Sequence, residues 1–174
     1  MATSTPPDSP QSPDLTPRQE VLETLAAQIM AIDTMIGLAQ RSIRVFDVDL
    51  STMGWNSLAR AEKIAGFLRA QRTSRLEIIV HDTAWIERSC PRITHLLKYY
   101  AHAVAILRTG EEAKHAMDPL VIVDDTHFLH RFHIAQPRAA FAIDAPDAAK
   151  PLIERFDAIR ASAEPGLSAS VLGL

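Results

Sequence analysis

Glycine is the residue type whose scarcity excludes most in this chain of 174 residues. The sequence holds six glycines, and the closest two, Gly166 and Gly173, lie seven positions apart. Dinucleotide-binding loops, Walker A loops and the nucleophile elbow of α/β-hydrolases all need glycines within a few residues of one another. The spacing therefore excludes a phosphate cradle built on closely spaced glycines.

Cysteine is rarer still, because Cys90 is the only one. A single cysteine excludes an intrachain disulfide and a zinc site with several cysteine ligands. Cys90 precedes Pro91 at a predicted helix start, a position that can lower the pKa of a thiol. A buried structural cysteine is the commoner case, and no cysteine-protease signature surrounds this one.

Long apolar runs and excess positive charge are also missing. The most apolar stretch, residues 25–39, is interrupted by Gln28, Asp33 and Thr34, so no membrane span is predicted. No apolar segment follows Met1, so we expect no secretory signal and a cytoplasmic protein. The formal net charge of −3 argues against a broad surface for duplex nucleic acid, although a local basic site stays open.

Composition divides the chain into three parts. Residues 1–17 hold five of the eleven prolines and one large apolar residue, Leu15, so we predict a disordered leader. Residues 18–164 are predicted to form one domain, since the 47% hydrophobic and 22% charged composition fits a globular core. Residues 165–174 are small and weakly patterned, and we expect this tail to fray.

Helices and strands alternate in the first two thirds of the chain. Apolar residues at spacings of three and four predict a helix from about residue 18 to 41. Later elements are predicted at 43–48 (strand), 57–71 (helix), 76–80 (strand), from Thr83 (short helix), from Pro91 (helix) and at 104–107 (strand). The helix at 57–71 is predicted to turn inward Leu58, Ala61, Ile64, Ala65 and Leu68.

The alternation stops after residue 107. Segments 119–125, 126–132 and 139–144 are predicted as three strands joined by short turns, and a last helix follows Asp144. The order α-β-α-β-α-β-β-β-β-α predicts an α/β fold with a mixed sheet. Its parallel β/α units are followed by an antiparallel extension, with helices on both faces.

Polar residues follow the predicted parallel strands. Ligands of open α/β sheets bind outside the carboxyl ends of these strands. Those ends carry Asp47, Asp49, His81, Asp82, Arg108 and Thr109. The first four could converge as acid/base groups or metal ligands. Alternatively, Asp82 caps the next helix and His81 ends a strand in water, which is the more frequent reason for such residues.

The segment 127–133 is rich in histidine. On a strand, His127 and His133 would share one face and His130 the other, which is poor geometry for one metal ion, so no metal site or cofactor is predicted. His130 or His133 is more simply a partly buried, hydrogen-bonded imidazole. Arg131 and Arg138 could bind an anion bidentately, or could lie on a solvated edge strand.

One segment places a histidine before a hydrophobic strand that ends in aspartate, after three β/α units: Lys114-His115-Ala-Met117-Asp118-Pro-Leu-Val-Ile-Val-Asp124-Asp125. This arrangement resembles the phospholipase D-like (PLD-like) superfamily, whose motif is H-x-K-x4-D. The resemblance implies a single PLD-like repeat. In that family the histidine attacks phosphorus, the lysine binds phosphate oxygens, and the apparatus needs two motifs, so single-motif members form dimers.

The motif itself is incomplete. Counted from His115, the lysine position holds Met117 and the aspartate position holds Ile122. Counted back from Asp124, the histidine and lysine positions hold Met117 and Pro119, while Lys114 lies on the wrong side of His115. A methionine cannot bind a phosphoryl oxygen by charge. The resemblance therefore supports the fold more than the activity.

A closer resemblance is to an uncharacterised bacterial PLD-like domain that is often fused C-terminal to GNAT-type acetyltransferases. It rests on the segments 46–50, 80–82, 90–106, 118–125 and 130–138. The chain has no room for an acetyltransferase and no glycine-spaced coenzyme A loop, so we expect a stand-alone copy. The resemblance brings no established function with it.

Three functions compete. The sequence favours a non-catalytic PLD-like domain that binds a small anionic ligand or an unknown protein partner, with candidate ligand-binding residues Asp47, Asp49, His81, Asp82, Arg131 and His133. The alternative is a homodimeric phosphodiesterase or nuclease of the phospholipase D type. It would use His115 as nucleophile and Lys114 or Arg131 as phosphate clamp. The third is a structural partner that assembles through its amphipathic first helix.

Overall fold

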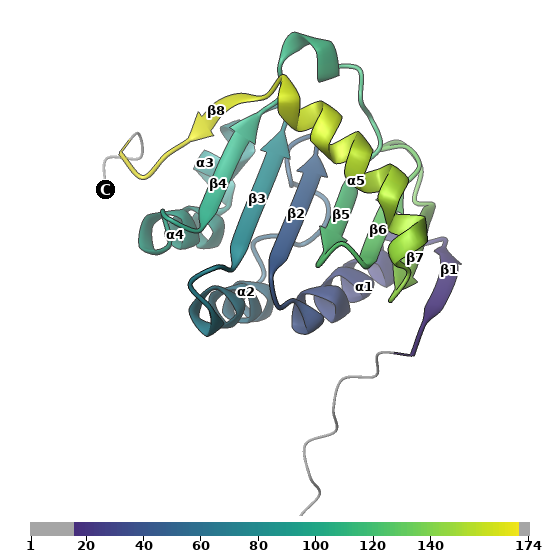
Figure 1. Ribbon diagram of the computed structural model, residues 1–174. Coiled ribbons are helices and arrows are strands. Elements are labelled where there is room, and N and C mark those ends of the chain that lie inside the picture. Colours follow the sequence, from purple (N-terminus) through teal and green to yellow (C-terminus); the bar gives the residue numbers. More distant parts are fainter. Residues whose placement is uncertain (1–15, 171–174) are drawn as a thin grey trace, which may run out of the picture.

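The computed structural model describes residues 16–170, which contain one mixed sheet of eight strands with helices on both faces (Figure 1). Most of the leader predicted for residues 1–17 lies outside the described residues, as do residues 171–174 of the predicted tail. None of the described helices is long and apolar enough to cross a membrane.

The strands run in the sheet order β1-β7-β6-β5-β2-β3-β4-β8. Their bounds are β1 (Arg18–Leu22), β2 (Ser42–Asp47), β3 (Arg75–Val80), β4 (Val104–Arg108), β5 (Leu120–Val123), β6 (His127–Arg131), β7 (Ala139–Ile143) and β8 (Glu164–Leu167). The helices are α1 (Leu25–Leu38), α2 (Leu58–Ala70), α3 (Ala84–Ser89), α4 (Pro91–Tyr99), α5 (Pro146–Ala161) and a short 3₁₀ helix, η1 (Glu111–Ala113).

Two kinds of strand pairing meet at β2. It pairs in parallel with β3, with Val45 opposite Ile78, and antiparallel with β5, with Val45 opposite Val121. β4 continues the parallel part, and β5, β6 and β7 form an antiparallel meander. The structure therefore confirms the predicted fold class of parallel β/α units followed by an antiparallel extension.

The sheet separates two apolar clusters, because successive strand residues point to opposite faces. Val45 belongs to the larger cluster, which is shared with α1, α2, α3 and α4. Phe46 belongs to the smaller cluster, which α5 covers. In Figure 1, α5 crosses its face diagonally and leaves the amino-terminal halves of β2, β3 and β4 without a helix above them.

The first helix begins later than predicted. Residues Arg18–Leu22 form the edge strand β1, with Glu20 opposite Phe141 of β7. The side chain of Thr24 then accepts a hydrogen bond from the backbone N–H of Ala27 at 3.2 Å and caps α1. The prediction failed here because an exposed edge strand carries no apolar alternation, and Leu22 happens to extend the helical spacing.

The tail that was predicted to fray from Pro165 begins with a strand. β8 pairs antiparallel with β4, with Leu167 opposite Ile106. Gly166 permits this pairing, since a Cβ at that position would lie 2.8 Å from the carbonyl oxygen of Ile106. A strand of four residues that is stabilised by backbone pairing shows no clear hydrophobic pattern, so the sequence did not predict it.

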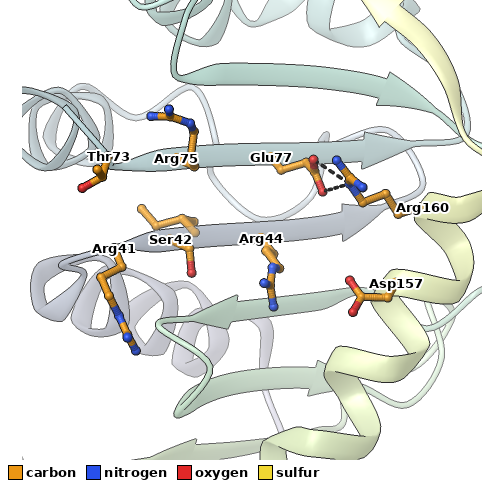
Figure 2. Close-up of a pocket in the computed structure, with 9 residues that line it drawn as sticks. Arg41, Ser42, Arg44, Thr73, Arg75, Glu77, Asp157 and Arg160 are labelled. Atoms are coloured by element: carbon orange, nitrogen blue, oxygen red, sulfur yellow. Dashed lines mark hydrogen bonds and ion pairs between the residues drawn. The ribbon is translucent and has the colours of Figure 1, made fainter. Parts of the chain in front are cut away.

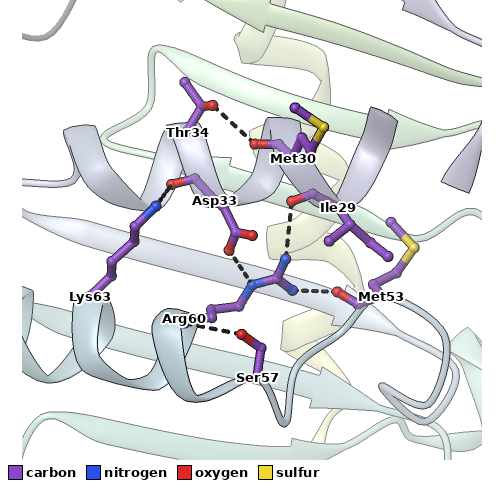
Figure 3. A network of polar contacts seen from close by, with 8 residues as sticks. All are labelled: Ile29, Met30, Asp33, Thr34, Met53, Ser57, Arg60 and Lys63. Carbon is purple, nitrogen blue, oxygen red and sulfur yellow. Dashed lines mark hydrogen bonds and ion pairs between the residues drawn. The ribbon is translucent and has the colours of Figure 1, made fainter. Parts of the chain in front are cut away.

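The buried face of α2 differs from the predicted one. Leu58 is 58% exposed, whereas Arg60 is fully buried. Figure 3 shows the Arg60 guanidinium between α1, α2 and the loop that follows β2, where it donates to the Asp33 carboxylate at 2.7 Å and to the carbonyls of Ile29 and Met53. Its carbon Cζ also lies 4.8 Å from the ring centroid of Trp55.

Candidate functional site

The carboxyl edge of the parallel strands gathers most of the predicted site residues. Asp47 ends β2, and His81 follows β3. Arg131 reaches the same edge, because β6 lies antiparallel to β5 and therefore runs in the direction of β2. Alternation along the strands nevertheless divides these residues between the two faces of the sheet, so they form two separate clusters.

The first cluster lies on the face covered by α1. Asp47 is 2% exposed, Arg131 is 4% exposed, and both line a small cavity with Trp55. The Nε and Nη2 groups of Arg131 donate to the carbonyls of Gln136 and Ile134. Arg131 Nη1 and Trp55 Nε1 have no hydrogen-bond partner among the described residues. The residues that line this cavity therefore include a buried carboxyl group and two nitrogen atoms whose N–H groups have no partner among the described residues.

The protonation of Asp47 is sensitive to this environment. Burial raises the pKa of Asp47 from 3.8 to about 6, and the charge of Asp49 acts in the same direction. The backbone N–H of Val48, which donates to Asp47 Oδ1 at 2.7 Å, and the charge of Arg131 lower the pKa but do not outweigh burial. The Asp47 carboxyl group therefore changes its protonation state near pH 6.

The second cluster lies on the face covered by α5 and includes His81. Its Nε2 lies 2.6 Å from the carbonyl oxygen of Ala116, and its Nδ1 lies 2.7 Å from Thr109 Oγ1. Because a carbonyl oxygen only accepts, Nε2 carries the proton and Nδ1 can accept from the threonine hydroxyl. The ring also meets Phe46 edge-on, with centroids 5.5 Å apart. Both ring nitrogens of His81 are thus engaged in holding loops together.

Asp118 is the charged centre of this cluster. Arg155 on α5 donates to both carboxylate oxygens of Asp118, and His130 Nε2 lies 3.0 Å from one of them. Burial acts to raise the pKa of Asp118, but the hydrogen bonds from His130 and Arg155 prevail and lower it from 3.8 to about 2. The carboxylate stays ionised and neutralises Arg155.

His115 and Lys114 are exposed beside this cluster. His115 lines a shallow groove between the η1 segment and α5, together with Arg155 and Ser162. Lys114 lies 3.5 Å from Glu111 in an exposed ion pair. The groove is on the α5 face, whereas Asp47 and Arg131 lie on the opposite face of the sheet.

Three further predicted site residues have local structural roles. Asp49 accepts from the backbone N–H of Ser51, Asp82 accepts from that of Ala84 at the start of α3, and His133 accepts from that of Ala135. Asp82 thus binds the first turn of α3 from the position before its N-cap residue, Thr83. The alternative interpretation was wrong for His81, whose two ring nitrogens contact Thr109 and Ala116 instead of water alone. Within residues 16–170, no group of three or more His, Cys, Asp or Glu side chains is placed to hold a metal ion.

Cys90 is fully buried at the junction of α3 and α4. Burial raises the pKa of its thiol, and the backbone N–H of Ile93 and the charge of Arg92 only partly oppose this. The helix start therefore does not activate Cys90, which contributes to the core instead.

Asp118, Arg155 and Trp55 were not singled out from the sequence. Asp118 lies within the segment that resembles the PLD motif. Counted from His115, however, it falls between the lysine position, 117, and the aspartate position, 122. Arg155 lies 37 positions later on another element. Only the fold brings the two together, and no spacing signal connects them.

The profile of a family described as "Domain of unknown function (DUF7931)" matches residues 24–168. No curated protein matches the sequence.

Solved structures share the fold at low sequence identity. Nuc, a phospholipase D family member from Salmonella typhimurium, is 15% identical, with 87% of this chain and 99% of Nuc covered and a TM-score of 0.60. NucT from Helicobacter pylori is 13% identical, with 86% and 99% covered and a TM-score of 0.57.

TrmBL2, an archaeal chromatin protein whose structure shows a novel mode of DNA binding, is 14% identical, with a TM-score of 0.65. The similarity covers 86% of this chain and 54% of TrmBL2, so the chain spans about half the length of that protein. The likeness to Nuc shows that the chain has a phospholipase D-like fold.

Proposed function

The chain belongs to the DUF7931 family, and we propose that it is a non-catalytic phospholipase D-like domain that acts as a binding module. The observation that carries this proposal is the identity of the residues before β5. Met117 and Pro119 occupy the positions of the catalytic histidine and the phosphate-binding lysine when the motif is counted back from Asp124.

The surroundings of Asp124 favour that register. Asp124 directly follows β5, and its carboxylate accepts hydrogen bonds from the backbone N–H groups of Gln40, Arg41 and Ser42 at 2.7, 2.7 and 2.9 Å. The other register places Ile122, a buried core residue, at the aspartate position. With Asp124 as the motif's aspartate, neither Met117 nor Pro119 can attack phosphorus or bind a phosphoryl oxygen.

The polar groups near the carboxyl ends of β2 and β3 do not replace the missing histidine and lysine of the motif. His81 uses both ring nitrogens, and Arg155 is neutralised by Asp118. Arg131, the suggested substitute clamp, lies on the face of the sheet opposite to His115. Lys114 is paired with Glu111. Among residues 16–170, His115 therefore lacks a free cation beside it for binding a phosphate.

The closer sequence resemblance supports a binding role as well. The bacterial PLD-like domains that the chain resembles are often fused C-terminal to a GNAT-type acetyltransferase, where another domain provides the catalysis. On this basis we propose that the chain binds an anionic ligand or a protein partner.

Hydrolysis of the activated diester bis(p-nitrophenyl) phosphate tests the absence of catalysis. We expect the wild type, His115→Ala and the control His102→Ala, which removes an exposed histidine outside the candidate site, to show the same background rate. A wild-type rate above background that His115→Ala abolishes and His102→Ala preserves would establish a phosphodiesterase.

The second candidate, a homodimeric phosphodiesterase or nuclease, keeps one observation in its favour. His115 is exposed in a groove that also contains Arg155, so a substrate phosphate could compete with Asp118 for that guanidinium. This mechanism needs two copies of the chain. Sedimentation that shows a strict monomer, together with background hydrolysis, would exclude it.

A further inference from the structure

A basic groove lies on the α5 face at the amino-terminal ends of β2 and β3, opposite to the edge that carries Asp47 and His81. It is formed where α5 leaves the amino-terminal ends of β2 and β3 uncovered (Figure 1). Its polar lining includes Arg41, Ser42, Arg44, Thr73, Arg75 and Arg160 (Figure 2). We call it the arginine groove. Neither the phospholipase D motif nor the set of candidate ligand-binding residues named above includes any of these side chains.

Two of its four arginines are compensated by acidic residues. Arg160 pairs with Glu77 at 2.8 Å, and Arg44 pairs with Asp125 at 2.6 Å. Asp157, the other acidic residue of the lining, is on α5 beside Arg160 and at the far end of the groove from Arg41 and Arg75 in Figure 2. Glu77 and Asp157 therefore lie toward α5, whereas the Asp124 carboxylate lies at the start of β2 and is bound by the backbone N–H groups of Arg41 and Ser42.

The two remaining arginines keep their full charge. Arg41 Nη2 donates to the carbonyl oxygen of Asp124 at 3.1 Å, and Arg75 Nη1 donates to the carbonyls of Arg72 and Ser74 at 2.9 and 2.8 Å. These carbonyls carry no net charge. Within the described part of the chain, no ion pair joins Arg41 or Arg75 to a carboxylate. Each guanidinium keeps further N–H donors for an anion.

The direction of these side chains limits the ligand. In Figure 2, Arg41 extends from the start of β2 and Arg75 from the start of β3, and the two side chains point away from each other, with Ser42 between them. Ser42 lies directly opposite Arg75 in the strand register. Diverging guanidiniums cannot close on one small anion. They can bind successive anionic groups of an extended ligand that lies across the strand ends.

We propose that the arginine groove binds a row of phosphate groups, presented by a single strand of nucleic acid. This inference rests on the binding role proposed above and names the ligand. A backbone with one charge per nucleotide offers successive phosphates to Arg41 and Arg75, and the hydroxyl of Ser42 can donate to a phosphate oxygen. A short site of this kind fits a chain whose net charge is −3, because only a local cluster has to be basic.

Fluorescence anisotropy with a labelled oligothymidylate of about 20 nucleotides tests the proposal. We expect the wild type to bind, with an affinity that falls as NaCl rises, because about two phosphates of a single strand neutralised by Arg41 and Arg75 give a log–log slope of about −1.4. The double variant Arg41→Gln/Arg75→Gln should bind at least about tenfold more weakly. The control Arg18→Gln/Arg88→Gln removes the same charge from exposed sites elsewhere and should bind like the wild type. Circular dichroism checks that both variants fold.

Competition identifies the ligand chemistry. Inorganic tripolyphosphate, which also presents phosphates in a row, should displace the oligonucleotide, whereas orthophosphate at equal ionic strength should not. Absence of saturable binding at low salt, an equal loss in both double variants, or equal displacement by orthophosphate would overturn the proposal.

The two proposals can be tested separately by whether the oligonucleotide binds and whether it is still intact after the binding experiment. A bound strand that remains intact supports both. A bound strand that is cleaved refutes the non-catalytic role and leaves the groove's ligand standing, whereas an unbound, intact strand refutes the groove proposal alone.

Discussion

Arg60 of α2 and Asp33 of α1 form an ion pair in which Arg60 Nε lies 2.7 Å from Asp33 Oδ1 and the arginine side chain is fully buried. The same guanidinium serves the carbonyls of Ile29 and Met53 (Figure 3). A single cation thus satisfies acceptors from the first helix and from the loop after β2, and it fixes how α1 and α2 pack.

Replacing Arg60 by leucine should lower the free energy of unfolding by about 3–5 kcal/mol, because Asp33 and two carbonyls lose their partner. Urea denaturation measures the change. Lys63→Ala is the control, since Lys63 donates to the backbone of Asp33 from an exposed position and should cost less than about 1 kcal/mol. Equal losses in the two variants would contradict a central role for Arg60.

Asp47 should make stability decrease as the pH rises. Its pKa is about 6 in the folded chain and near 3.8 without burial, so the folded state binds the proton more tightly. The stabilisation is complete below about pH 4 and is lost as the pH passes through about 6. Between these limits the free energy of unfolding of the wild type should fall by up to about 3 kcal/mol relative to that of Asp47→Asn.

Chemical denaturation of the wild type and Asp47→Asn between about pH 4 and 7.5 measures this difference. Asp147→Asn serves as a control, because the Asp147 side chain is 96% exposed and its replacement should leave the pH dependence unchanged. If the wild type and Asp47→Asn run parallel over this range, burial does not control the proton on Asp47.

Asp118 should act in the opposite direction. Its pKa is lowered to about 2, so the clamp with Arg155 and His130 stabilises the fold above about pH 4 and is lost as the pH falls toward 2. We expect Asp118→Asn to be about 2 kcal/mol less stable than the wild type at neutral pH, with the difference lost as the pH falls through about 2. A difference that persists unchanged at low pH would mean that packing, and not ionisation, is lost.

Asp124 should tolerate asparagine better than alanine. Its carboxylate binds three backbone N–H groups, and its backbone is left-handed, with φ of 54°. Asp124→Ala removes every acceptor and strains the backbone, so we expect a loss of about 3 kcal/mol or more. Asn keeps one acceptor and adopts this backbone readily, so Asp124→Asn should lose about half as much. Thermal or urea unfolding distinguishes the two, and equal losses would exclude this explanation.

Periodicity and strand order predicted the centre of the fold correctly. Val45, Ile78 and Val121 lie in apolar runs that are typical of buried strands, and the structure places them side by side. The edges were not predicted, since β1 and β8 pair with one neighbour each and are stabilised largely by backbone hydrogen bonds. Periodicity also missed Arg60, because a buried cation interrupts the apolar face of α2.

The candidate site could be predicted only as far as the edge of the sheet. Asp47 lies opposite Val80 in the parallel register, so His81 is one position further along and points to the other face. That register depends on how the strands pair and cannot be counted from the sequence. The contact between Asp118 and Arg155 likewise depends on the path of α5 across the sheet.

The first and last strands along the described chain, β1 and β8, are the two opposite edges of the sheet. A pulling force applied between Arg18 and Leu167 therefore acts across the strands and not along them. Hydrogen bonds between neighbouring strands would carry this load one pair of strands after another, and an edge strand would peel away first. Along this axis the domain should be mechanically soft, unlike a fold in which neighbouring terminal strands must slide past each other.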